Sequence, residues 1–478
     1  MKSCSRARAA SPSRRGSARL AALVAVTVGM FPMAACSSDL LSVEDPDIIN
    51  PSNVQSAAGA DAVRLGALGR LNVATSGMAS TSGSASDGIF LLGGMFADEW
   101  LNGDSFIARQ EIDQRTITPA NGFLTSANRE LHRARLSAEQ AVELLTRYNP
   151  TAPAWQMAEM YLVQAYVSNM LAEHFCSGLV FSTVVEGGEQ YGSPVTTTAA
   201  FERALEHANA GLALVTGTTA ADLRVRHALQ VTRGRILMNL HRPADAAAAV
   251  AGVPTSFRYQ MLHSETTRSN ATWVRNNLQR RYSVGNSEGG NGLNFATAGD
   301  PRVPICVGGD VACRAIGVTS TQRDDLQRPL HVQMIWPTRE SPVTIISGVE
   351  ARLIEAEAAL NKGQSAADLP ILNALRTATG TGSGGVAGLV PLADAGTGAA
   401  RVNQLFRERA FWLFGRGHRV GDLRRLIRDY NRPANTVFPS GAWQKGGNYG
   451  SDVSLPTPQD ELNNPNVAGG DVCLNREA

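Results

Sequence analysis

Charged and aromatic side chains are concentrated between positions 407 and 428, in the sequence RERAFWLFGRGHRVGDLRRLIR. This stretch holds seven arginines, three aromatic residues and only two carboxylates. The composition alone allows a nucleic-acid-binding segment, a membrane-surface helix or a piece of folded core. Two glycines interrupt an amphipathic pattern, and Arg409 and Arg419 flank the break. Guanidinium groups at such a junction can bind carboxylates and helix-end carbonyls. With Glu408 and Asp422 as available partners, we predict that these four residues form a structural clamp between two core helices.

The charge distribution argues against nucleic-acid binding. Six positive charges and no acidic residue lie within the first 35 positions, and the rest of the chain carries 38 basic against 42 acidic residues. Affinity for nucleic acid depends largely on neutralising phosphates. A net-negative body without a basic tail is therefore not expected to bind it.

A second group of residues has the chemistry to bind a ligand. Aromatic residues make up only 6% of the chain, so those outside helical patterns are informative. A sugar ring offers apolar C–H faces and hydroxyls, which suit an aromatic platform beside amide and guanidinium donors. The candidate ligand-binding residues are Trp100, Asn102, Trp273, Arg275, Tyr282 and Trp336. The alternative for Trp100 and Trp336 is that they anchor the loops to the core, where we also place Trp155 and Trp412.

Catalytic motifs are weak. The G-x-S-x-G match at 285–289 continues as a glycine-rich loop, whereas a nucleophile elbow needs a strand before the serine and a helix after it. No HExxH or CxxC pattern is present. The pairs Asp98–Glu99 and Asp324–Asp325 are adjacent in sequence and do not match the separations of glycosidase carboxylates. Distant carboxylates can still meet in space, but we expect no enzyme, no metal site and no cofactor.

Helical periodicity dominates the rest of the chain. The segment around 227–253 predicts a helix, a short turn at 241–243 and an alanine-rich second helix, and the segment 349–380 repeats this layout. Small residues and tight turns are how tetratricopeptide-type helix pairs pack. We predict a mostly α fold with irregular tetratricopeptide-like pairs, little β structure and a loop-rich insertion at about 255–344.

The N-terminus predicts export. A basic region is followed by the apolar run Leu20–Met30, which is too short to span a membrane and has the layout of a signal peptide over residues 1–35. Met33-Ala34-Ala35-Cys36 resembles a bacterial lipobox, although Met33 replaces the usual leucine. We expect Cys36 to be lipidated and residues 36–53 to form a tether. The alternative is ordinary cleavage near Ala35.

Four cysteines remain after the signal peptide and Cys36 are set aside, in a compartment that permits disulfides. Cys306 and Cys313 bracket a short glycine-containing loop and form a candidate disulfide. Cys176 and Cys473 are the second pair by elimination.

Four sequence motifs resemble those of the SusD/RagB-like outer-membrane nutrient-binding lipoproteins. The clamp resembles the signature of this family, although Trp412 and Arg416 stand where glutamates are usual. VEARLIEAEAALNKG resembles a family helix, DPRV at Asp300 a recurrent DPR, and SLPTPQDELNNPN at 454–466 a closing motif. The signature positions matched are Glu408, Arg409, Leu413, Gly417, Arg419, Asp422, Leu423 and Arg425.

This resemblance implies that residues 54–478 form one SusD-like domain that captures a nutrient, such as a glycan, without breaking a bond. It implies a TonB-dependent outer-membrane transporter as partner, and an outer-membrane location through the lipid anchor alone. The runner-up is an envelope adaptor of tetratricopeptide type that binds proteins. A secreted hydrolase is a more distant alternative.

Overall fold

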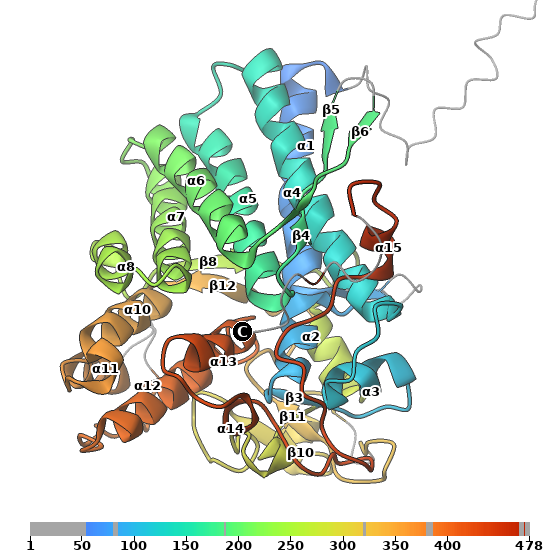
Figure 1. Cartoon of the computed structure of the whole chain (residues 1–478), viewed down its shortest axis with the longest axis vertical. Coiled ribbons are helices and arrows are strands. Elements are labelled where there is room, and N and C mark those ends of the chain that lie inside the picture. Colours follow the sequence, from blue (N-terminus) through green and yellow to red (C-terminus); the bar gives the residue numbers. More distant parts are fainter. Residues whose placement is uncertain are drawn as a thin grey trace, which may run out of the picture. The chain divides into compact units, whose positions relative to one another are not determined.

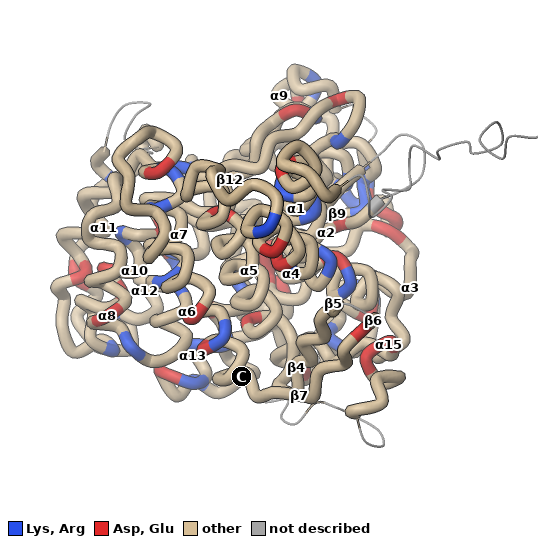
Figure 2. The backbone as a smooth tube through the Cα atoms, turned by 90° about the horizontal axis from the view of Figure 1, so that it is seen from above, with Lys and Arg blue, Asp and Glu red and all other residues tan. Residues whose placement is uncertain are grey.

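The structure is a computed structural model that describes residues 54–79, 85–185, 188–318, 322–378, 386–467 and 473. Cys36, the signal peptide and the tether lie outside the described residues. Residues 51–478 form one unit. Among the described residues, no helix is long and apolar enough to cross a membrane. Basic and acidic residues are interspersed along the backbone of this unit (Figure 2).

Antiparallel helices make up most of the unit (Figure 1). Successive helices from α4 to α8 pack against one another, α10 packs against α8 and α11, and α1 packs against α4. The helices of this scaffold are α1 (Ala57–Ser76), α4 (Gly122–Tyr148), α5 (Ala154–His174), α6 (Thr197–Leu214), α7 (Ala220–Asn239), α8 (Pro243–Val250), α10 (Gly348–Leu360), α11 (Leu369–Thr377), α12 (Gly398–Trp412) and α13 (Arg419–Arg428). The predicted mostly α fold is confirmed.

The α7–α8 pair shows how local sequence produces a repeat unit. Thr219 and Asp222 form a reciprocal capping box at the start of α7, which satisfies two backbone donors there. Pro243 occupies the first turn of α8, where its missing N–H costs nothing. Gly234 lets the two helices approach closely, since an added Cβ would lie 2.5 Å from a methyl group of Val250. The predicted turn at 241–243 therefore joins a tightly packed pair.

The predicted insertion contains short strands rather than long helices. Strand β8 (Arg258–Met261) pairs antiparallel with β12 (Val343–Ser347), with Val343 opposite Met261. In the insertion, β9 (Tyr282–Val284) pairs with β3 (Trp100–Asn102), which lies outside it. Strands β10 (Ile305–Val307) and β11 (His331–Gln333) are both in the insertion and pair with each other. Residues 273–278 form a π-helix, and α9 (Val311–Ala315) is one short helix turn.

The remaining elements are short. Helices α2 (Gly88–Phe96) and α3 (Ile107–Gln114) lie between α1 and α4 in the chain, and α14 (Ala434–Val437) and α15 (Gln459–Leu462) follow α13. Three further two-stranded ribbons pair β1 (Met78–Ala79) with β2 (Ala85–Ser86), β4 (Leu179–Val180) with β7 (Pro194–Val195), and β5 (Thr183–Val185) with β6 (Gly188–Gln190).

Both expected disulfides are present. Cys306 and Cys313 are joined within the β10–α9 turn, where they pack with Val318, Leu330 and Val332 in a small apolar cluster of their own. Cys176 and Cys473 are joined across 297 positions of sequence. This second bridge holds the end of the chain near the end of α5, where Leu455 also accepts a hydrogen bond from the Cys176 backbone N–H.

Candidate functional site

The turn between α12 and α13 depends on two glycines. Gly415 and Gly417 have φ angles of 67° and 72°, a left-handed conformation that other residues adopt only at a cost. Both also lie against aromatic rings. An added Cβ would be 2.4 Å from the Phe90 ring at position 417 and 3.1 Å from the Trp336 ring at position 415. The predicted helix break is therefore a tight turn packed on core rings.

The predicted clamp exists, but its pairing differs from the expectation. Arg409 binds Asp422 through two hydrogen bonds of 2.9 Å, which joins α12 to α13. Arg419 does not pair with Asp422. It binds Asp98, at 2.6 and 2.7 Å, in the segment after α2. Sequence adjacency suggested the wrong partner because Asp98 is 321 positions away and meets Arg419 only in the fold.

Glu408 also has partners that the clamp prediction did not include. It accepts hydrogen bonds from Arg302 at 2.6 and 3.1 Å, and one from Arg376 at 2.7 Å. Arg302 is held in turn by Asp300 of the DPRV motif. The DPRV motif is therefore joined to the clamp motif through Glu408.

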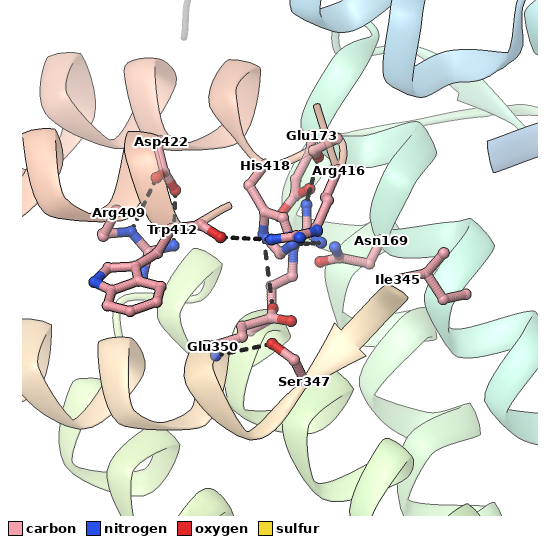
Figure 3. Close-up of polar contacts among 12 residues, drawn as sticks. Asn169, Glu173, Ile345, Ser347, Glu350, Arg409, Trp412, Arg416, His418 and Asp422 are labelled. Carbon is pink, nitrogen blue, oxygen red and sulfur yellow. Dashed lines mark hydrogen bonds and ion pairs between the residues drawn. The ribbon is translucent and has the colours of Figure 1, made fainter. Parts of the chain in front are cut away.

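Side chains of α5 and α10 meet those of α12 and α13 at the junction between α12 and α13 (Figure 3). His418 lies 3.7 Å from Glu350. Burial raises the pKa of Glu350 to about 7. Burial and the surrounding arginines hold the pKa of His418 well below its usual value, so its ring is neutral. The backbone N–H of Glu350 donates to Ser347 Oγ at 3.1 Å, so Ser347 caps the start of α10.

A cavity of about 430 Å³ lies beside this junction, where β8, β12, the segment after β11 and the end of α12 meet. Its wall combines aromatic rings, arginines and neutral hydrogen-bonding groups. The main lining residues are Phe257, Trp336 and Trp412, then Arg258, Arg302 and Arg416, then Gln260, Ser341 and Thr344. The insertion and the clamp helices therefore build the cavity together.

No protein-family model and no curated protein matches the sequence. Solved structures do match it. A SusD-like carbohydrate-binding protein from Bacteroides fragilis aligns with a TM-score of 0.61 at 13% identity, over 87% of this chain and 99% of that one. A SusD homolog from Bacteroides thetaiotaomicron gives 0.60 at 13% identity, over 88% and 99%. A SusD/RagB family protein from the same species gives 0.60 at 10% identity, over 85% and 94%.

The chain has the SusD-like fold. The resemblance inferred from the motifs is confirmed at the level of the fold. Within it, the motif residues of α12 and α13 are core ion pairs, and the loop-rich insertion contributes most of the cavity wall.

Five of the six candidate ligand residues are buried, and Trp273 is half-buried. Trp100, Asn102 and Tyr282 are each 0% exposed, and they lie on the β3–β9 ribbon that joins the insertion to α2. The Trp100 ring packs against Phe414 at 5.0 Å. The Tyr282 hydroxyl donates to Asp87 at 2.8 Å. These residues cannot form an exposed platform, and the alternative that Trp100 anchors the loops is the one the structure supports.

Arg275 and Trp273 also lie outside the cavity. Arg275 pairs with the buried Asp87 at 2.7 Å. Although burial raises it, the pKa of Asp87 is lowered overall by Arg109 and Arg275. Trp273 is half-buried beneath the Arg339 guanidinium, 5.2 Å from its ring centroid. Arg275 is therefore the partner of a buried carboxylate rather than an exposed donor, and no local signal in the sequence indicates this because Asp87 is 188 positions away.

Trp336 is 3% exposed, and among the six candidates it is the one whose side chain lines the cavity. Sequence reasoning did not identify the residues beside it in the wall. Trp412 belongs to the core, as expected, yet it also forms part of the wall. Arg258, Gln260 and Arg416 were not singled out. The alternation on β8, with Arg258 and Gln260 exposed and Tyr259 buried, would have identified the first two.

The weak catalytic motif has the geometry of a loop. Strand β9 ends at Val284, and Ser287 precedes a three-residue 3-10 turn at 288–290 instead of the helix of a nucleophile elbow. The adjacent carboxylates Asp98 and Glu99 both have protein partners. Asp98 pairs with Arg419, and Glu99 accepts a hydrogen bond from the Gly415 backbone N–H. In the described ranges, no group of three or more His, Cys, Asp or Glu side chains could hold a metal ion.

Proposed function

We propose that this protein captures a glycan in the cavity beside Trp336 and passes it to a TonB-dependent outer-membrane transporter without chemical change. The observation that carries the proposal is a SusD-like fold with a ligand-sized cavity at the insertion. Two of the similar structures are SusD-like carbohydrate-binding proteins.

The cavity wall has the chemistry that sugar recognition requires. Trp336 and Trp412 are 3% and 5% exposed, and the parts of their rings that line the cavity offer aromatic surface for C–H groups. Gln260 and Thr344, which are hydrogen-bonded to each other at 3.2 Å, offer neutral donors and acceptors beside those rings. A cavity of about 430 Å³ is within the range of small-molecule sites.

The first test is glycan binding by variants of the cavity. Gln260→Ala removes an exposed amide, and Trp336→Phe replaces the indole of the cavity wall with a smaller aromatic ring. Each should weaken binding by about tenfold. Gln260→Ala should do so with little change in Tm, whereas Trp336 is 3% exposed, so binding by Trp336→Phe is measured well below the Tm of that variant. Trp273→Ala is the matched control, because Trp273 lies in the same insertion but outside the cavity. Equal losses in all three variants would contradict this placement of the site. Binding to peptides instead of glycans would favour an adaptor.

Membrane attachment is part of the proposal and has its own test. Cys36→Ala should release the protein into soluble fractions, because two or three acyl chains hold a protein firmly to a bilayer. A variant that stayed with the membrane after a salt wash would contradict lipid anchoring through Cys36. Co-purification of the lipidated protein with a TonB-dependent transporter would support the handover.

A further inference from the structure

The charged residues that line the cavity are all positive. Among the described residues that line it, three are arginines and none is Asp or Glu. Arg302 is neutralised by Asp300 and Glu408. Arg258 and Arg416 make no ion pair with any carboxylate in the part of the chain that the structure describes. The cavity therefore carries two uncompensated guanidinium groups.

Other arginines in the core have more protein hydrogen-bond partners than Arg416 and Arg258. Arg409 and Arg419 each make two hydrogen bonds to a carboxylate. Arg424 has no carboxylate partner, but one of its nitrogens donates to three backbone carbonyls at the end of α5. Arg416 donates to one carbonyl, that of Trp412 at 2.6 Å. Its Nε is buried without a partner among the described residues, whereas its Nη2 donates to no described protein group and is the donor left for a ligand.

We propose that the cavity binds an anionic group of its glycan ligand, a carboxylate or a sulfate ester, through Arg416 and Arg258. This inference rests on the proposed function and adds the class of glycan to it. A planar guanidinium presents paired donors that match the oxygens of either group. The Trp336 ring, whose centroid lies 5.9 Å from the Arg416 guanidinium carbon, helps to hold that guanidinium at the wall.

The surroundings of Arg416 explain why an anion is favoured. Burial, and then the neighbouring charge of Arg258, lower the pKa of Arg416 to about 10, which still leaves it charged at neutral pH. The acidic group that acts on it is Glu99, which forms no ion pair with Arg416 and does not line the cavity. Burial raises the pKa of Glu99 to about 8, so Glu99 is mostly protonated at pH 7. A bound anion would relieve the repulsion between the two arginines.

The experiment compares matched acidic and neutral glycans on the purified full-length protein by calorimetry at low salt. One pair is a set of uronic-acid oligosaccharides and the same set after reduction of each carboxylate to an alcohol. The other pair is a set of sulfated oligosaccharides and their desulfated forms. We expect an acidic member to bind about tenfold or more tightly than its neutral counterpart, and to lose affinity as salt rises. The pair that binds identifies the anionic group.

Variants assign the effect to the two arginines. Arg416→Gln and Arg258→Gln should each weaken binding of the acidic member by about tenfold and leave any neutral binding unchanged. Arg416→Lys should restore part of the affinity. Arg147→Gln is the control, because Arg147 is an exposed arginine at the end of α4 that does not line the cavity. Tm values for all four variants show whether each remains folded.

The outcomes separate the inference from the proposed function. Equal affinity for neutral and acidic members, or unchanged acidic binding in both glutamine variants, would overturn the anionic site and leave glycan capture standing. Failure of every glycan in both pairs, and of a panel of neutral plant and microbial oligosaccharides, would overturn both.

Discussion

Two sets of arginines near the α12–α13 turn have opposite surroundings. Arg409 and Arg419 are buried and each faces an aspartate in bidentate geometry. Arg416 lies between them in the sequence but points to a cavity with Arg258 and faces no carboxylate among the described residues. The residue type is the same, and only the partner differs.

This difference separates arginines that hold the fold from arginines available to a ligand. A buried guanidinium without a partner is costly, so the core supplies an acidic residue for each clamp arginine. An arginine at a cavity wall can keep part of its hydration, so the fold tolerates it unpaired. Substitutions at Arg419, Gly417, Glu99 and Arg258 test this distinction.

The largest effect is expected from Arg419→Ala. This change leaves Asp98, which is 0% exposed, without its charged partner. Removing one member of a buried pair costs about 3–5 kcal/mol. Chemical denaturation should show that loss in the free energy of unfolding. A double variant, Arg419→Met with Asp98→Leu, should recover much of it. Normal stability in Arg419→Ala would mean that the clamp does not hold the fold.

The second effect tests the turn that separates the two sets. Gly417→Ala would place a Cβ 2.4 Å from the Phe90 ring in a left-handed conformation. Overpacking and backbone strain together should cost about 2–4 kcal/mol. Gly299→Ala is the control, since Gly299 has a similar φ of 61° and nothing within 4 Å of an added Cβ. Equal losses in free energy of unfolding would show that contact with Phe90 contributes nothing.

The third effect is a pH dependence at Glu99, which interacts with arginines of both sets. Burial, and also the charge of Asp98, raise the pKa of Glu99 to about 8 from an ordinary 4.5. The folded protein then keeps a proton that the unfolded chain releases above about pH 4.5. Stability from this group is therefore greatest below that pH and falls as pH rises toward 8, by at most about 1.4 kcal/mol per pH unit.

Glu99→Gln keeps the acceptor for the Gly415 backbone N–H but removes the titration. Denaturation curves between pH 5 and 8 should show a shallower decline in stability for this variant than for the wild type. Parallel declines would mean that Glu99 does not titrate in this window.

The smallest effect on folding is expected from Arg258→Gln. Arg258 is exposed and makes no ion pair with the described residues, so its loss should change the free energy of unfolding by less than about 0.5 kcal/mol. A drop comparable with that of Arg419→Ala would erase the distinction between the two sets.

Much of the fold was predictable because its signals are local. Thr219 and Asp222 begin α7, and Pro243 begins α8, through caps that involve residues three positions apart or fewer. The loop-rich insertion followed from the absence of helical periodicity between 255 and 344. The Cys306–Cys313 bridge spans only 7 positions, which made it the easier disulfide to infer.

The candidate site was much less predictable. Trp100, Trp273 and Trp336 look alike in the sequence, since each lies in an irregular segment. Trp100 is enclosed because β3 pairs with β9 and Phe414 packs on its ring, and these contacts join positions far apart in the chain. Trp336 reaches the cavity because Gly415 leaves room for it.

Local sequence is enough to predict the helical pairs, the glycine turn after α12 and the presence of a clamp, because these depend on periodicity, backbone conformation and residue type over short spans. Long-range packing sets the rest: Arg419 pairs with Asp98, Arg302 joins the DPRV motif to Glu408, and Arg416 lines a cavity. Each of these outcomes depends on which side chain a fold of hundreds of residues places within hydrogen-bonding distance, and an arginine carries no local mark of its distant partner.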